Sequence, residues 1–140
     1  MIRGCFADAG YRIGLSNKQD ALHAVARAWT NQISGTNVTT AAVLLETANA
    51  LSRPVWRAAV VELIESLRAR TDVAIVPWSD GLIARAWGLY AARRDKEWAL
   101  TDCGSFVVMS EYRLTDARAD DPHFEQAGFR ALLRLDPKRA

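Results

Sequence analysis

The sequence has few of the residues that mark a disulfide-bonded, zinc-thiolate or membrane protein. It contains only two cysteines, Cys5 and Cys103, and no Cys-x-x-Cys pair, which excludes a disulfide scaffold and a zinc site built from thiolates. It lacks an apolar run of about 18 residues, the length that a membrane span requires. Its first residues lack the hydrophobic stretch of a signal peptide. We therefore expect a cytoplasmic protein with reduced cysteines and no membrane partner.

Proline and glycine are also scarce. They supply only 4 and 8 of the 140 residues, and half of all residues are hydrophobic, which excludes a disordered or collagen-like chain. The charged residues give a net charge of only +2, too near neutrality to mark a nucleic-acid-binding protein by charge alone. The two histidines, His23 and His123, give no support for a histidine-based triad or an HExxH zinc site. The length fits one domain, which we expect to span residues 1–140.

Hydrophobic periodicity predicts strands alternating with helices. We expect strands at 2–8, 38–39, 72–77 and 113–119, and a last strand at Leu132, Leu133 and Leu135. The predicted helices span 20–33, 40–51, 54–67, 79–90, 101–109 and 121–126, with Thr101 as the cap of the fifth. This alternation predicts an α/β fold with a largely parallel central sheet.

A few acidic residues fall where a solvated charge is not expected. Asp8 follows the first strand, and ligands bind at the carboxyl ends of the strands in open parallel sheets; a helix cap is the ordinary alternative. Glu46 is the only ionisable residue in the apolar helix at 41–51. A buried, unpaired carboxylate is costly, so Glu46 must reach either solvent or a cation. The apolar character of this helix favours the cation.

Two further acids are placed by the starts of helices. Asp102 lies in the first turn of its helix, either as an acid favoured by the helix dipole or as a metal ligand. Asp121 opens the helix before Phe124, and its neighbour Asp120 could be the ligand instead, with Asp121 only capping the helix. Carboxylate oxygens suit Mg²⁺ or Mn²⁺. Such ions can activate water and stabilise an in-line displacement at phosphorus.

Four segments resemble the PIN-domain family. They are Phe-Ala-Asp at 6–8, the helix at 39–51, the stretch at 95–106 that contains Thr-Asp-Cys-Gly-Ser-Phe, and Asp-Pro-His-Phe-Glu-Gln-Ala-Gly-Phe at 121–129. The resemblance implies a three-layer α/β/α fold around a mainly parallel sheet of four to five strands. It also implies Mg²⁺- or Mn²⁺-dependent hydrolysis of single-stranded RNA, with catalytic and metal-binding acids at Asp8, Glu46, Asp102 and Asp121.

Many bacterial members of this size are similar to VapC toxins of type II toxin–antitoxin pairs, which implies a small antitoxin as partner. We also expect a homodimer. The departure from the family pattern is the Asp120–Asp121 pair, which keeps Asp120 open as the alternative fourth acid.

The remaining candidate residues would contact the substrate. Arg94 and Lys96 precede the third acid and could hold the phosphate backbone, although such charge runs are usually solvated surface. Thr101 and Ser105 would orient RNA or support the acids. The alternative function is a non-catalytic PIN-like module that binds RNA or protein, whose sequence would be expected to have lost Asp8 or Asp102.

Overall fold

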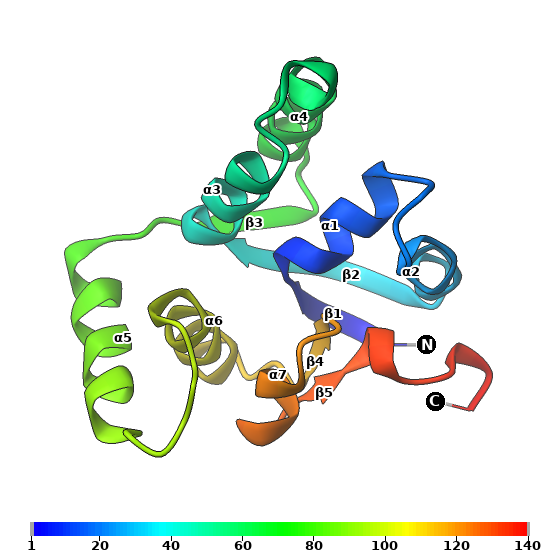
Figure 1. Cartoon of the computed structure of the whole chain (residues 1–140). Coiled ribbons are helices and arrows are strands. Elements are labelled where there is room, and N and C mark those ends of the chain that lie inside the picture. The colour runs from blue at the N-terminus through cyan, green and yellow to red at the C-terminus, as the bar shows by residue number, and fades with distance from the viewer. Residues whose placement is uncertain (1, 140) are drawn as a thin grey trace.

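Five parallel strands form the centre of the computed structural model, which describes residues 2–139 (Figure 1). Their order across the sheet is β3-β2-β1-β4-β5, and every neighbouring pair is parallel. The strands are β1 (Ile2–Ala7), β2 (Ile33–Thr40), β3 (Val73–Val76), β4 (Asp116–Arg118) and β5 (Arg130–Ala131). The predicted parallel sheet of four to five strands is confirmed.

Helices cover both faces of this sheet. They are α1 (Ala9–Ser16), α2 (His23–Thr30), α3 (Ala41–Ala50), α4 (Pro54–Ala69), α5 (Asp80–Ala92), α6 (Leu100–Glu111) and α7 (Pro122–Gln126), followed by the 3₁₀ turns Leu132–Arg134 and Pro137–Arg139. Figure 1 shows α1 and α2 on one side of the sheet and α6 and α7 on the other, with α5 outside α6. The layers are therefore α/β/α, as expected. No helix in the described part of the chain is long and apolar enough to cross a bilayer.

The alternation of side chains along β1 divides the core into two parts. Phe6 is fully buried and contacts Phe124, which in turn packs edge-on against Phe106 of α6. The next residue, Ala7, points to the opposite face and joins the cluster around Trp29 of α2. Because successive residues of a strand point to opposite faces, one short strand holds both helical layers in register.

Several predicted element boundaries were wrong. The helix predicted at 20–33 ends at Thr30, and Ile33 instead begins β2, which is longer than the strand predicted at 38–39. Gly35 has a φ of 84°, a left-handed backbone conformation that glycine adopts far more readily than other residues. Helix α1 was not predicted at all.

The ends of two other predicted elements also differ. Leu132 and Leu133 are both buried in a 3₁₀ turn, a conformation that places adjacent leucines in the core where a strand would separate them. Strand β4 begins only at Asp116, because the N–H of Leu114 bonds to Met109 and closes α6. Helix α6 begins at Leu100 with Ala99 as its N-cap, so Thr101 is not the cap.

Candidate metal centre

Asp8 lies where two strands end side by side. It follows β1, and its backbone N–H donates to the carbonyl of Arg118, the last residue of β4, at 3.2 Å. Burial raises the pKa of the Asp8 carboxyl from 3.8 to about 7, and the N–H of Ala9 lowers it. The negative charges of Glu46, Asp102 and Asp121 raise it further. Four acids from four separate segments therefore act on one another at this edge of the sheet.

Glu46 is carried to the same edge by α3. The helix starts directly after β2, where the buried Thr40 accepts a hydrogen bond from the N–H of Val43 at 3.2 Å. The Glu46 side chain is exposed, yet partial burial raises its pKa, a hydrogen bond from the Thr101 hydroxyl lowers it, and Asp102 and Asp121 raise it. Glu46 thus both reaches solvent and faces the other acids.

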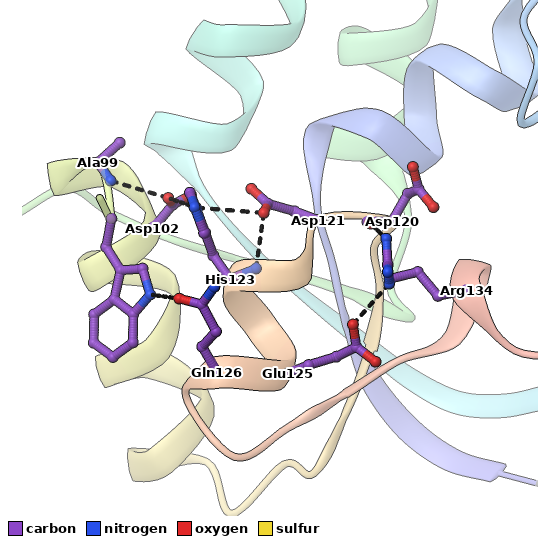
Figure 2. Close-up of polar contacts among 9 residues, drawn as sticks. Ala99, Asp102, Asp120, Asp121, His123, Glu125, Gln126 and Arg134 are labelled. Carbon is purple, nitrogen blue, oxygen red and sulfur yellow. Dashed lines mark hydrogen bonds and ion pairs between the residues drawn. The ribbon is translucent and has the colours of Figure 1, made fainter. Parts of the chain in front are cut away.

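Asp102 is held by two hydrogen bonds at the start of α6. Its Oδ2 accepts from the backbone N–H of Ala99 at 3.0 Å and lies 3.1 Å from Nδ1 of His123 (Figure 2). Burial raises the pKa of Asp102, while these two partners lower it. The side chain is only 15% exposed. The sequence predicted this residue at a helix start, and the fold gives it a fixed orientation there.

His123 joins the third acid to the fourth. Its Nδ1 lies 3.3 Å from Oδ1 of Asp121, in addition to its contact with Asp102. One ligand atom from each of Asp102, Asp121 and His123 falls within 4.8 Å of the other two, a spacing that could hold a metal ion. No ligand role was predicted for His123 from the sequence. The one sequence feature that pointed to His123 was its position two residues after Asp121. That position indicates a role at the site only once α6 is known to bring Asp102 beside it.

Asp121 and Asp120 face different directions. Asp121 is the N-cap of α7, and its Oδ1 accepts from the N–H of His123 at 2.9 Å. Figure 2 shows its other oxygen turned away from this bond, and shows the carboxyl group of Asp120 pointing away from Asp102. Asp120 contacts the chain through its carbonyl, which accepts from Arg134 at 3.3 Å. The fold brings Asp121, and not Asp120, to the other acids.

The four predicted substrate-binding residues divide into two groups. Thr101 bonds to Glu46, and Ser105 is 1% exposed with its hydroxyl donating to the Thr101 carbonyl at 3.2 Å. Ser105 therefore supports the start of α6 and does not present its hydroxyl to solvent. Arg94 is exposed and Lys96 is partly exposed; both lie in the charged loop before α6.

Two aromatic contacts fix α6 where these acids meet. Trp98 is 5% exposed, and its Nε1 donates to Oε1 of Gln126 in α7 at 3.0 Å (Figure 2). The ring of Trp78 fits against Gly104, where a Cβ atom would overlap it. These contacts set the position of Asp102 relative to Asp121.

Comparison with known proteins agrees with this geometry. A sequence model of the PIN domain matches residues 6–130. The 23S rRNA-specific endonuclease VapC20, from two strains of Mycobacterium tuberculosis, is 30% identical over 125 residues, which cover 89% of this chain and 94% of VapC20. The crystal structure of M. tuberculosis VapC20, a sarcin–ricin loop cleaving toxin, has a TM-score of 0.83 at 28% identity and covers 91% of this chain and 97% of that one. The chain belongs to the PIN-domain family.

Proposed function

We propose that this chain is a metal-dependent endoribonuclease that hydrolyses phosphodiester bonds of single-stranded RNA, with residues 1–140 as one nuclease domain. The observation that carries the proposal is the mutual electrostatic effect of Asp8, Glu46, Asp102 and Asp121 at one edge of the sheet. Membership of the PIN-domain family and the similarity to the endonuclease VapC20 support it.

The side chains present fit a divalent cation. Their donors are carboxylate oxygens, which suit Mg²⁺ and Mn²⁺, and Nδ1 of His123 lies beside them. Burial and, to a smaller extent, the like charges around Asp8 raise its pKa, and a bound cation would relieve the repulsion between those charges. Asp8, Glu46, Asp102 and Asp121 would hold the ion. When bound, such an ion lowers the pKa of water and neutralises the charge that develops on the phosphate.

Residues around the acids would orient them and the substrate. The N–H of Ala99 and the ring of His123 fix the Asp102 carboxylate, and the Thr101 hydroxyl fixes Glu46. Supporting hydrogen bonds of this kind preserve both the geometry and the ionised state of a ligand. Water as the nucleophile implies products with a 5′-phosphate and a 3′-hydroxyl.

The loop before α6 offers a surface for the RNA backbone. A cavity of about 480 Å³ is lined by Arg93, Arg94, Lys96 and the exposed rings of Trp87 and Tyr90, among others. These two rings stack at 5.5 Å between centroids, and Arg93 lies over Trp98 at 5.0 Å. Basic groups beside exposed aromatic rings are typical of surfaces that bind single-stranded nucleic acid. We assign backbone contacts to Arg94 and Lys96.

We further propose that the chain is the toxin of a type II toxin–antitoxin pair, bound by a small antitoxin, and that it forms a homodimer. The similarity to VapC20, a toxin, supports the first part. Exposed apolar side chains on α4, including Val55 at 78% and Val61 at 50%, are typical of a surface that binds another protein chain, and they support both parts of the proposal. Because VapC20 is specific for 23S rRNA, a ribosomal RNA loop is the structured substrate to test first.

Cleavage by the purified chain tests the proposal. A 5′-labelled single-stranded RNA and 23S rRNA would be incubated with the protein and Mg²⁺, Mn²⁺ or a chelator. We expect cleavage with either metal, products ending in 3′-hydroxyl groups, and no cleavage in the chelator. Cleavage that persists in the chelator, or products with 2′,3′-cyclic phosphates, would exclude metal-dependent hydrolysis by water.

A further inference from the structure

Two aromatic rings stand exposed side by side on α5. Trp87 is 57% exposed and Tyr90 is 44% exposed. They lie three residues apart, so they are neighbours on the helix surface, and their rings stack at 5.5 Å between centroids with an interplanar angle of 22°. Water in contact with so much apolar surface is unfavourable. A contiguous exposed patch of this kind indicates a surface that another molecule covers.

The two rings border the cavity of about 480 Å³ described above. Its other walls are the charged loop that follows α5 and the first turn of α6, because Arg94, Lys96 and Cys103 line it as well. The volume falls in the range of small-molecule pockets, about 300–1,000 Å³, which leaves room for a nucleobase. The rings and the basic residues therefore belong to one hollow.

The charge of this cavity suits a polyanion. Arg93, Arg94 and Lys96 line it, and Glu97 is the one acid among the described lining residues. Asp95 pairs with Arg93 at 3.1 Å and lies 3.9 Å from Lys96. Arg94 is exposed and takes part in no ion pair within residues 2–139. Its guanidinium is therefore available to a phosphate group.

The cavity shares a wall with the acidic cluster. The ring of Trp98 lines it, and the Nε1 of the same ring donates at 3.0 Å to Gln126 in α7, the helix that Asp121 caps. Cys103, another lining residue, follows Asp102 in α6. Figure 1 shows α6 between α5 and α7. A short nucleic-acid segment held at the acids therefore reaches α5 by crossing the first turn of α6.

The acids by themselves do not attract RNA. Without a metal, their negative charges repel the phosphates, and contacts to phosphates carry no information about the bases. Unpaired bases can stack on aromatic side chains, whereas the bases of a duplex are already stacked on one another. Exposed rings beside the acids would therefore favour single-stranded over duplex RNA.

We propose that Trp87 and Tyr90 form a platform on which an unpaired base of the RNA stacks, next to the phosphate at the acidic cluster, while Arg94 contacts the backbone. This proposal rests on the ribonuclease function proposed above. The base continues the stack of the two rings. Because every base has a π-face, the platform selects unpaired RNA and no particular sequence.

Binding of RNA in chelator tests the platform without requiring cleavage. A short labelled single-stranded RNA, and the same sequence as a duplex, would be titrated with the whole protein at low salt and followed by fluorescence anisotropy. Trp87→Ala and Tyr90→Ala should each weaken binding of the single strand by about tenfold or more. Trp87→Phe, which keeps a ring, should recover most of this loss. Affinity for the duplex should not change in these variants.

Tyr112→Ala is the matched control. Its ring is 49% exposed, but it follows the last residue of α6, at the opposite end of that helix from Asp102, so it should bind RNA as the wild type does. The salt dependence of the affinity gives a second readout. The ring variants should keep the wild-type slope, whereas Arg94→Gln should lower it by about one. Because all these side chains are exposed, melting temperatures should stay at the wild-type value.

Undiminished affinity for the single strand in both Trp87→Ala and Tyr90→Ala would overturn the proposal, as would a wild type that does not bind single-stranded RNA at low salt. A third contrary result is a changed mass of these variants in solution, measured by light scattering, with wild-type RNA affinity. The rings would then contact another protein chain.

Cleavage assays in Mn²⁺ separate this proposal from the proposed function. A wild type that binds RNA through the rings but does not cleave it would support the platform and exclude the nuclease. A wild type that cleaves RNA, with ring variants that bind it unchanged, would exclude the platform and leave the nuclease.

Discussion

Nδ1 of His123 lies 3.1 Å from Oδ2 of Asp102 and 3.3 Å from Oδ1 of Asp121, so one ring links two acids from different helices. The negative charges of both acids also raise the pKa of Asp8, after burial, its largest cause. The ring therefore contacts two of the acids that act on Asp8.

His123→Ala should release this link. We expect Mn²⁺ to bind about tenfold more weakly, the size of loss that follows removal of a supporting contact to a ligand. Titration calorimetry would measure it. His23→Ala is the matched control, because His23 bonds to the Gly14 carbonyl at 2.8 Å, away from the acids. Equal Mn²⁺ affinity in both variants would show that His123 does not organise the site.

The pKa of Asp8 predicts how stability depends on pH. Because the folded-state pKa, about 7, lies above the ordinary 3.8, the stability that Asp8 contributes is fully present below about pH 3.8 and is lost as the pH rises through 7. Asp8→Asn removes this loss. At about 1.36 kcal/mol per pKa unit, the variant should be more stable than the metal-free wild type by a few kcal/mol at pH 8.

Thermal melts of wild type and Asp8→Asn from pH 4 to pH 8, in chelator, would measure the difference. It should shrink toward zero near pH 4, and Mn²⁺ should reverse it at pH 8 by stabilising only the wild type. A wild type that gains stability over the variant as the pH rises would contradict the raised pKa.

Gly104→Ala should destabilise the fold by about 1–3 kcal/mol, because a Cβ atom there overlaps the Trp78 ring in a packed core. Gly88→Ala is a matched control on α5. No atom lies within 4 Å of the Cβ position there, so the higher helix propensity of alanine should stabilise the protein by up to about 1 kcal/mol. Chemical denaturation would compare them. Two variants with the same midpoint would rule out the role of this contact.

Asp121→Asn and Asp120→Asn separate the two candidates for the fourth acid. Asparagine caps helices as well as aspartate does, so Asp121→Asn should retain stability while losing the charge that faces Asp102. Mn²⁺-dependent RNA cleavage should fall strongly in Asp121→Asn and little in Asp120→Asn. The reverse order would assign the fourth acid to Asp120 and leave Asp121 as a cap.

The fold could be predicted from the sequence because its elements have strong local signals. Thr40 and Ser79, at the starts of two predicted helices, accept capping bonds, and Pro54 stands in the first turn of α4. The predicted ends of helices and strands were wrong where tertiary contacts, rather than local sequence, determine where an element begins or ends. Helix α1 was missed because it follows β1 directly, with only Asp8 between Ala7 and Ala9 to separate the strand from the helix.

Each acidic residue of the site could be predicted from the sequence, but the contacts between these residues and their neighbours could not. Glu46 stood out as a lone charge in an apolar helix, and the structure places it within electrostatic reach of Asp8. The contact between His123 and Asp102 spans 21 positions, and it depends on how α7 packs against α6.

RNA cleavage by the purified Asp8→Asn variant tests most directly whether the acidic cluster carries the reaction. Wild type, Asp8→Asn and the control Asp120→Asn would be assayed on single-stranded RNA in Mn²⁺, with thermal melts confirming that each is folded. We expect cleavage by Asp8→Asn to fall by about a hundredfold or more, since the loss of a ligand removes several kcal/mol of transition-state stabilisation. Cleavage by the folded variant at the wild-type rate would contradict this assignment.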